Sequence, residues 1–153
     1  DYPNWQLNIF GKGDMRDELQ RHIDGLGLSD SVHLCGRTPK PYYEMRRSSI
    51  FVLSSHYEGF PNVLCEAMYA GDLCISSDCV SGPRELIVPG KNGWLFPVGD
   101  EHKLTDELRH CIKSIESGDD MDSIRSSAQN TVKRLYMDEN IKHWVCLVQK
   151  VKR

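Results

Sequence analysis

The amino-acid sequence predicts an α/β domain built around a doubly wound parallel β-sheet. Short apolar segments of strand length alternate along the chain with segments whose apolar residues recur at helical spacing. Residues 50–53 (Ile-Phe-Val-Leu) are all apolar, which is typical of a strand covered on both faces. Parallel sheets of this kind bind ligands beyond the carboxyl ends of their strands. We therefore expect the functional site in the loops that follow the strands.

Local signals place the individual elements. Asp14 is a candidate helix N-cap, and Gly27 and Gly71 follow helical patterns at positions where glycine commonly ends a helix. Pro41 stands where the first turn of a helix tolerates proline. The predicted strands span residues 5–10, 32–35, 50–53, 73–76 and 93–96. The predicted helices span residues 14–26, 41–48, 63–70, 85–88 and 100–115, followed by 123–136 and 138–150 in a helical tail at 119–153.

Composition and charge indicate a globular cytoplasmic protein. The 153 residues suit one domain, and a net charge of −3 argues against a surface for nucleic acid. No apolar run approaches the roughly 18 residues of a membrane span, and the N-terminus lacks a signal-peptide pattern. The six cysteines form no Cys-x-x-Cys pair and most lie in apolar runs, so we interpret them as buried, reduced thiols.

The segment 54–66 carries the strongest functional signal, because it follows a predicted strand and leads into a helix. Gly59 permits close approach of the backbone to a ligand, and Pro61 sits where a helix can begin. Several free backbone N–H groups can converge there on an anion, together with the positive end of the helix dipole. These N–H groups belong to Gly59, Phe60, Asn62 and Val63.

Two carboxylates flank this predicted anion site. Glu58 lies in the loop before the helix, while Glu66 and Asn62 are four residues apart and share one helix face. A carboxylate accepts hydrogen bonds from two hydroxyl groups, which suits the neighbouring hydroxyls of a sugar. A structural interpretation stands beside this one: Glu66 can act as a capping partner of Asn62 or a solvated residue, and Glu58 as an ordinary loop charge.

A set of motifs continues this pattern along about two-thirds of the chain. It comprises Glu58-x7-Glu66 around Gly59-Phe60-Pro61-Asn62, then Gly71, residues 81–86 (Ser-Gly-Pro-Arg-Glu-Leu) and 92–100 (Asn-Gly-Trp-Leu-Phe-Pro-Val-Gly-Asp), with 9–13 (Ile-Phe-Gly-Lys-Gly) and 32–37 (Val-His-Leu-Cys-Gly-Arg) upstream. The ensemble resembles the C-terminal, nucleotide-sugar-binding domain of retaining family 4 glycosyltransferases, also called glycosyl transferases group 1. This resemblance implies a Rossmann-like domain that forms one half of a GT-B fold.

The resemblance also implies roles for individual residues. Glu58 is the expected catalytic residue and contacts the hydroxyls of the donor sugar, while Glu66 accepts hydrogen bonds from the ribose hydroxyls. The other donor-binding residues would surround the diphosphate and the base: Gly11, Gly36, Arg37, Thr38, Gly59, Phe60, Pro61, Asn62 and Val63. The family implies a nucleotide diphosphate sugar as donor, UDP-linked by our expectation, with no metal ion and no further cofactor.

The implied enzyme is a hexosyltransferase of polysaccharide biosynthesis that acts with retention on a glycan or lipid-linked acceptor. Its partner would be an N-terminal acceptor-binding domain of the same protein, with peripheral association at the cytoplasmic membrane face. In the family this half begins with a central strand, whose following loop carries an Arg and a Lys. Residues 5–10 already match the second strand, so we expect residues 1–153 to be one donor-binding domain that is inactive alone. A second departure, Asp72-Leu73 where the family usually has proline, is predicted to be harmless.

Other functions fit the sequence less well. A nicotinamide-binding fingerprint would need a third glycine where Arg16 stands. His56, Cys65 and Cys79 lack the spacing of zinc ligands. Glu66 lies on the predicted phosphate-binding helix, which argues against a glycosidase pair with Glu58. A non-catalytic nucleotide-sugar-binding module remains the alternative function.

Overall fold

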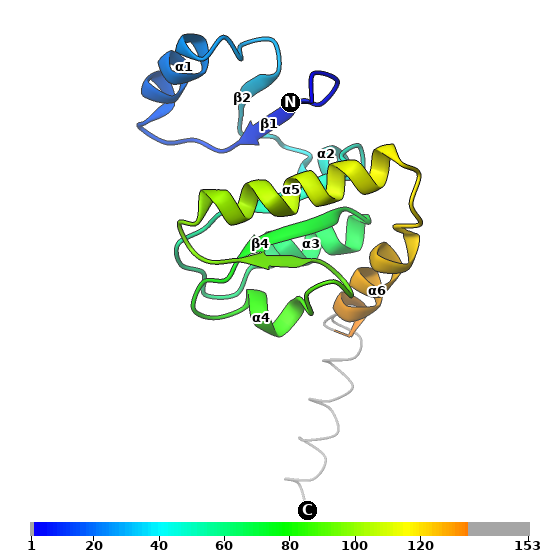
Figure 1. Cartoon of the computed structure of the whole chain (residues 1–153). Helices are drawn as coiled ribbons and strands as arrows, with labels where there is room; N and C mark the ends of the chain where they lie inside the picture. Colours follow the sequence, from blue (N-terminus) through cyan, green and yellow to red (C-terminus); the bar gives the residue numbers. More distant parts are fainter. Residues whose placement is uncertain (1, 135–153) are drawn as a thin grey trace, which may run out of the picture. The chain divides into compact units, whose positions relative to one another are not determined.

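The computed structural model describes residues 2–134, which form two compact units divided between Pro41 and Tyr42. The predicted helix 138–150 and Cys146 lie outside the described residues. Figure 1 shows the elements of each unit coloured along the chain. We describe each unit by itself.

The first unit is a β-α-β motif. Strands β1 (Leu7–Phe10) and β2 (Val32–Gly36) pair in parallel, with Ile9 opposite Leu34. Helix α1 (Arg16–Gly25) connects them and ends before Gly27, whose φ of 67° is the left-handed conformation predicted for this glycine. The prediction of Asp14 as N-cap is wrong. The N-cap is Met15, one residue later, and no side chain caps the helix.

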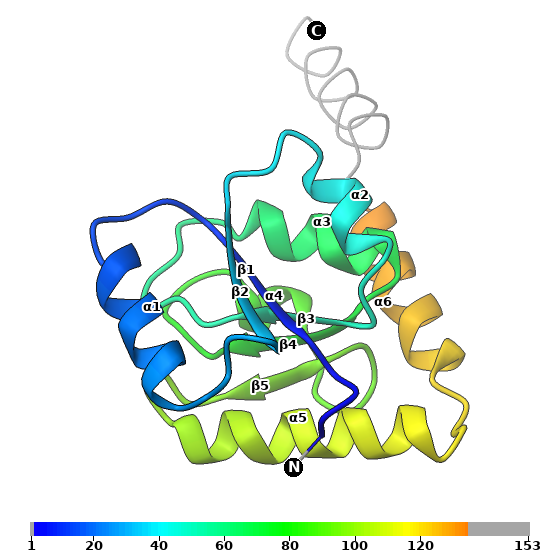
Figure 2. The ribbon, with the colours of Figure 1, turned by 90° about the horizontal axis from the view of Figure 1, so that it is seen from above.

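The second unit contains a three-stranded parallel sheet in the order β3-β4-β5, with strands β3 (Ile50–Leu53), β4 (Leu73–Ser77) and β5 (Trp94–Phe96). Its helices are α2 (Pro41–Met45), α3 (Asn62–Ala70), α4 (Pro83–Leu86), α5 (Glu101–Glu116) and α6 (Asp122–Lys133). Figure 2 shows α5 along one side of these strands and α3 along the other. This three-layer arrangement confirms the predicted α/β class.

Alternating residues of the buried central strand β4 build the two halves of the core. Cys74 packs with residues of α3 and α6, including Leu64 and Val132. Leu73 and Ile75 point to the opposite face and pack with residues of β5 and α5, including Trp94 and Cys111. Because successive side chains of a strand point to opposite faces, an uninterrupted apolar strand fills both layers.

The described strands form two sheets rather than the single sheet expected from the sequence. β1 is hydrogen-bonded to β2, and β3 is hydrogen-bonded to β4. Within residues 2–134, no strand belongs to both sheets.

Asn92 organises the turn between α4 and β5. Its side chain is 2% exposed and accepts a hydrogen bond from the Val88 amide (2.7 Å). Its Nδ2 donates to the Leu86 carbonyl and to Oγ1 of Thr131 on α6, both at 2.9 Å. All of these bonds are buried or partly buried, so this one side chain joins the turn to a helix 39 residues further along the chain.

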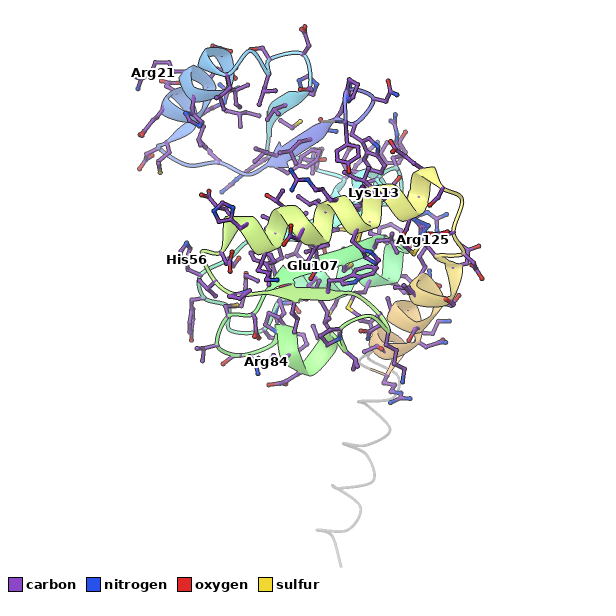
Figure 3. The ribbon with its side chains drawn as sticks, viewed as in Figure 1. Arg21, His56, Arg84, Glu107, Lys113 and Arg125 are labelled. Atoms are coloured by element: carbon purple, nitrogen blue, oxygen red, sulfur yellow. The ribbon has the colours of Figure 1, made fainter. Side chains whose placement is uncertain are left out.

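Asp72 is a buried carboxylate at the start of β4. It is 2% exposed, and Oγ of Ser48 donates a hydrogen bond to its Oδ1 at 2.7 Å. Its Oδ2 has no hydrogen-bond partner within the described part of the chain. Burial raises the pKa of Asp72 to about 6, against the opposing effects of the Ser48 bond and the positive charge of Arg125, which Figure 3 labels on α6. The departure from the family pattern at this position therefore has an energetic cost that sequence analysis did not anticipate.

Replacing Asp72 with asparagine is expected to stabilise the protein at about pH 8 by roughly 1–2 kcal/mol. The native pKa lies above the ordinary value of 3.8, so the favourable contribution of the protonated carboxyl is lost as pH rises through about 6. Asparagine keeps an acceptor for Ser48 and carries no charge at any pH. Thermal unfolding of D72N and wild type across this range measures the effect, which should shrink toward about pH 4.

The exposed Asp106→Asn on α5 serves as the control and should show no comparable pH-dependent gain. A D72N variant less stable than wild type at about pH 8 would show that the attraction to Arg125 outweighs the cost of burial.

Candidate donor-binding site

The loop between β3 and α3 presents backbone donors at the carboxyl end of the sheet. Pro61 is buried at the N-cap of α3, which has no side-chain cap. Within residues 2–134, the amide N–H groups of Gly59, Phe60 and Val63 donate to no protein acceptor. The prediction was wrong for the Asn62 amide, which donates to the Phe60 carbonyl at 2.9 Å. The uncapped start of α3 thus offers three amide donors together with the helix dipole, an arrangement suited to an anion.

Glu66 and Asn62 lie one helical turn apart on α3, and both are exposed. No hydrogen bond joins their side chains within the described residues, and neither caps the helix. The capping interpretation of Glu66 is therefore wrong. Its carboxylate is free to accept hydrogen bonds from a ligand at the start of α3.

Glu58 is half-buried and is held by a neighbouring serine. Oγ of Ser55 donates a hydrogen bond to Oε1 of Glu58 at 2.7 Å. Ser55 is held in turn by Ser77, whose Oγ donates to the Ser55 carbonyl at 2.5 Å. Glu58 thus has a hydrogen-bond partner within its own loop. Neither serine was predicted from the sequence, although the spacing of Ser55 and Glu58 permits their bond.

A second loop braces the start of α3. Gly82, the N-cap of α4, has a φ of 94°, and a Cβ built on it would overlap Cδ of Pro61. The preceding Ser81 has a φ of 72°, an uncommon conformation for a residue other than glycine. The loop after β4 therefore depends on glycine to pack closely against the residue that begins α3.

An ion pair joins the beginning and end of the same loop. Arg84 of α4, labelled in Figure 3, donates two hydrogen bonds to the carboxylate of Asp78, which follows β4. These bonds raise the pKa of Arg84. The Asp78 amide also donates to the Phe96 carbonyl at 2.8 Å. The bidentate pair closes the loop that carries Gly82, although the arginine itself is largely exposed.

The remaining predicted residues belong to the first unit. The Gly11 amide donates to the Gly36 carbonyl at 2.9 Å, which ties together the loops after β1 and β2. Both glycines and Arg37 line a cavity of about 490 Å³. Thr38 does not line it, and its hydroxyl accepts a hydrogen bond from the Lys40 amide. The other lining residues, which sequence analysis did not select, are Ile9, Lys12, Gly13, Met15, Arg16, Leu19 and Leu34.

Two kinds of feature are absent from the described residues. Among residues 2–134, no three His, Cys, Asp or Glu side chains are grouped so that they could hold a metal ion. In the same part of the chain, no helix combines the length and apolar character needed to cross a membrane.

The described cysteines differ in exposure. Cys35 is exposed, Cys65 is half-buried and three further cysteines are buried, so the expectation of buried, free thiols holds for only part of the set.

The parallel strands and the helices on either side of them define a Rossmann-like α/β domain, and the uncapped start of α3 follows the carboxyl end of β3. The chain belongs to the glycosyl transferases group 1 family, whose model matches residues 1–130. The recognition drawn from the sequence motifs is thereby confirmed at the level of this family.

Individual proteins are similar to this chain in sequence or in fold. The chain is 36% identical over 147 residues to an exopolysaccharide phosphotransferase of Streptomyces coelicolor, covering 94% of this chain and 15% of that protein. It is 40% identical over 112 residues to a lipopolysaccharide 1,6-galactosyltransferase of Salmonella typhimurium, covering 71% and 31%. The fold superimposes with a TM-score of 0.83 on an Anabaena protein, HepE, solved with UDP, at 23% identity and over 97% of this chain and 42% of that one. The chain thus spans less than half the length of each of these proteins.

Proposed function

We propose that this chain is the donor-binding half of a glycosyltransferase that transfers a hexosyl group from a UDP-linked sugar to a glycan or lipid-linked acceptor, with retention of configuration. One observation carries the proposal: three free amide donors at or just before the start of α3 lie, in the sequence, between two carboxylates, Glu58 and Glu66. This arrangement offers donors to a diphosphate and acceptors to hydroxyl groups on either side of it. Membership of the glycosyl transferases group 1 family supports the same function.

The proposed division of labour follows the chemistry of each group. The Val63 amide, the Asn62 side chain and the dipole of α3 bind the diphosphate, assisted by the amides of Gly59 and Phe60. Glu66 accepts hydrogen bonds from the ribose hydroxyls, and Glu58 from hydroxyls of the sugar. Gly36, Arg37 and Thr38 border the base in this proposal, and Gly11 is a further donor-binding residue.

In our proposal the phosphate charge is offset by the helix dipole and by basic residues, with no resident metal ion or other cofactor. The acceptor is bound by an N-terminal domain of the same protein, which acts in the cytoplasm at the membrane face. The chain alone binds the donor and transfers nothing. Its span of less than half the length of its relatives supports this last point.

Replacing Glu66 with alanine tests the site. The substitution removes charge-assisted hydrogen bonds worth about 1.5–3 kcal/mol, so affinity for UDP is expected to fall roughly 10- to 150-fold. Calorimetric titration of the full-length protein with UDP measures this loss. Asp106→Ala, which removes an exposed negative charge from α5, should keep the wild-type affinity. Unchanged UDP binding in E66A would overturn the ribose assignment.

A further inference from the structure

Glu58 receives one hydrogen bond within the described part of the chain, and it comes from Ser55. The donor is a hydroxyl group and the acceptor is Oε1 of the carboxylate, at 2.7 Å. A carboxylate has about four acceptor positions on its two oxygens, and this bond occupies one of them. It restricts rotation of the carboxylate and leaves Oε2 to accept hydrogen bonds from elsewhere.

The position of Ser55 is itself determined by β4. The backbone pairing of β3 with β4 ends at Leu53 opposite Ser76. Ser77 is the last residue of β4, is 1% exposed, and donates its hydroxyl hydrogen to the Ser55 carbonyl at 2.5 Å. A side-chain bond therefore continues the connection between the two strands beyond the point where the backbone pairing ends.

Ser76 provides an internal contrast. It is fully buried on the same strand, but its hydroxyl donates to the carbonyl of the adjacent Ser77 at 3.0 Å and remains within β4. The two neighbouring serines are thus equally inaccessible to solvent, yet only the hydroxyl of Ser77 bonds to the loop that carries Glu58.

We propose that Ser55, held by Ser77, is a positioning residue that orients the Glu58 carboxylate toward the hydroxyl groups of the donor sugar. Neither serine contacts the nucleotide in this scheme. Ser55 acts through the carboxylate, and Ser77 acts through the backbone of Ser55. The inference rests on the proposed role of Glu58 as the residue that binds the sugar. In this proposal the two serines increase the affinity for a nucleotide that carries a sugar relative to the affinity for the nucleotide alone.

The experiment compares affinities for UDP and for UDP-glucose, UDP-galactose and UDP-N-acetylglucosamine in the full-length protein, using the sugar that wild type binds best. Ser55→Ala is expected to lower affinity for that UDP-sugar roughly tenfold while leaving affinity for UDP unchanged. Ser55→Thr keeps a hydroxyl at this position and should restore most of the loss. Ser77→Ala should act in the same direction with a smaller effect, and the matched control Ser76→Ala should bind both ligands as wild type does.

The Glu58→Ala variant distinguishes a failure of the positioning role of Ser55 from a failure of the proposed role of Glu58. If E58A loses the preference for the UDP-sugar while S55A and S77A keep it, the positioning role is overturned and the role of Glu58 stands. If E58A itself keeps the preference, the proposed role of Glu58 fails and the inference fails with it. An equal loss of UDP and UDP-sugar affinity in S55A, without rescue in S55T, would show a merely structural serine and would also overturn the proposal.

Discussion

Glu58→Gln is expected to lower the turnover of the full-length transferase roughly 10²- to 10³-fold while leaving UDP affinity within about twofold of wild type. Glutamine preserves the size of the side chain and removes its charge. In sugar transfer, positive charge develops on the sugar ring as the bond to the leaving group breaks. A carboxylate beside the ring stabilises that charge, and the hydrogen bond from Ser55 gives Glu58 a partner within its loop.

Steady-state kinetics with the UDP-sugar and calorimetry with UDP measure the two effects separately. Glu66→Ala should show the opposite pattern, with a larger effect on UDP affinity. If both substitutions weaken UDP binding to the same extent, the proposed division between the sugar and the ribose is wrong.

Gly82→Ala is expected to destabilise the fold by about 2–5 kcal/mol. The left-handed conformation of Gly82 disfavours any Cβ, and the added methyl group would overlap the buried ring of Pro61. Since Pro61 begins α3, relief of this overlap must displace the loop after β4 or the start of the proposed donor-binding helix. Urea unfolding measures the loss of stability, and UDP titration measures the displacement.

Gly90 offers a matched control for this substitution. Its φ of 74° is also left-handed, but a Cβ built there meets no atom within 4 Å. Gly90→Ala therefore reports the backbone cost alone, about 1 kcal/mol. A Pro61→Ala substitution in the G82A background should recover part of the lost stability, because it removes the overlapping ring. Equal free energies of unfolding in G82A and G90A would show that the overlap with Pro61 does not contribute to the loss of stability.

Local sequence signals predicted most elements of the fold because the determining residues are adjacent in the chain. Gly71 ends α3 in the predicted left-handed conformation, and Asp100 caps α5 by accepting a hydrogen bond from the Lys103 amide. The apolar run 50–53 is the observed strand β3. Other boundaries moved by one to a few residues, as for the strand predicted at 5–10 and observed as Leu7–Phe10, or the helix predicted at 41–48 and observed as Pro41–Met45.

One prediction that failed depended on distant partners. The short helix predicted at 85–88 is α4, which begins at Pro83, and Ile87 is already extended. The Val88 amide bonds to the side chain of Asn92, whose own position depends on Thr131 of α6. No local pattern contains that information.

In the candidate site, too, the contacts between residues distant in the sequence were not predicted. The positions of the β3–α3 loop, of Glu58 within it and of Glu66 on α3 followed from the motif, and the described residues place the loop at the carboxyl end of β3 as expected. The bond from Ser77 to Ser55 spans 22 residues and depends on how β3 pairs with β4. The roles of these residues in binding and turnover remain predictions for the experiments above.

The hydrogen bonds of Asn92 also bear on how this protein ages chemically. Asparagine followed by glycine is prone to deamidation, because the small glycine lets its backbone nitrogen attack the side-chain amide carbon. In the native turn the Asn92 amide is held by Val88, Leu86 and Thr131 and cannot rotate to meet that attack. Deamidation therefore requires local opening, so its rate records how often this turn opens. The aspartate that results would be a buried charge facing the Leu86 carbonyl, so each such event would weaken the connection between the turn and α6.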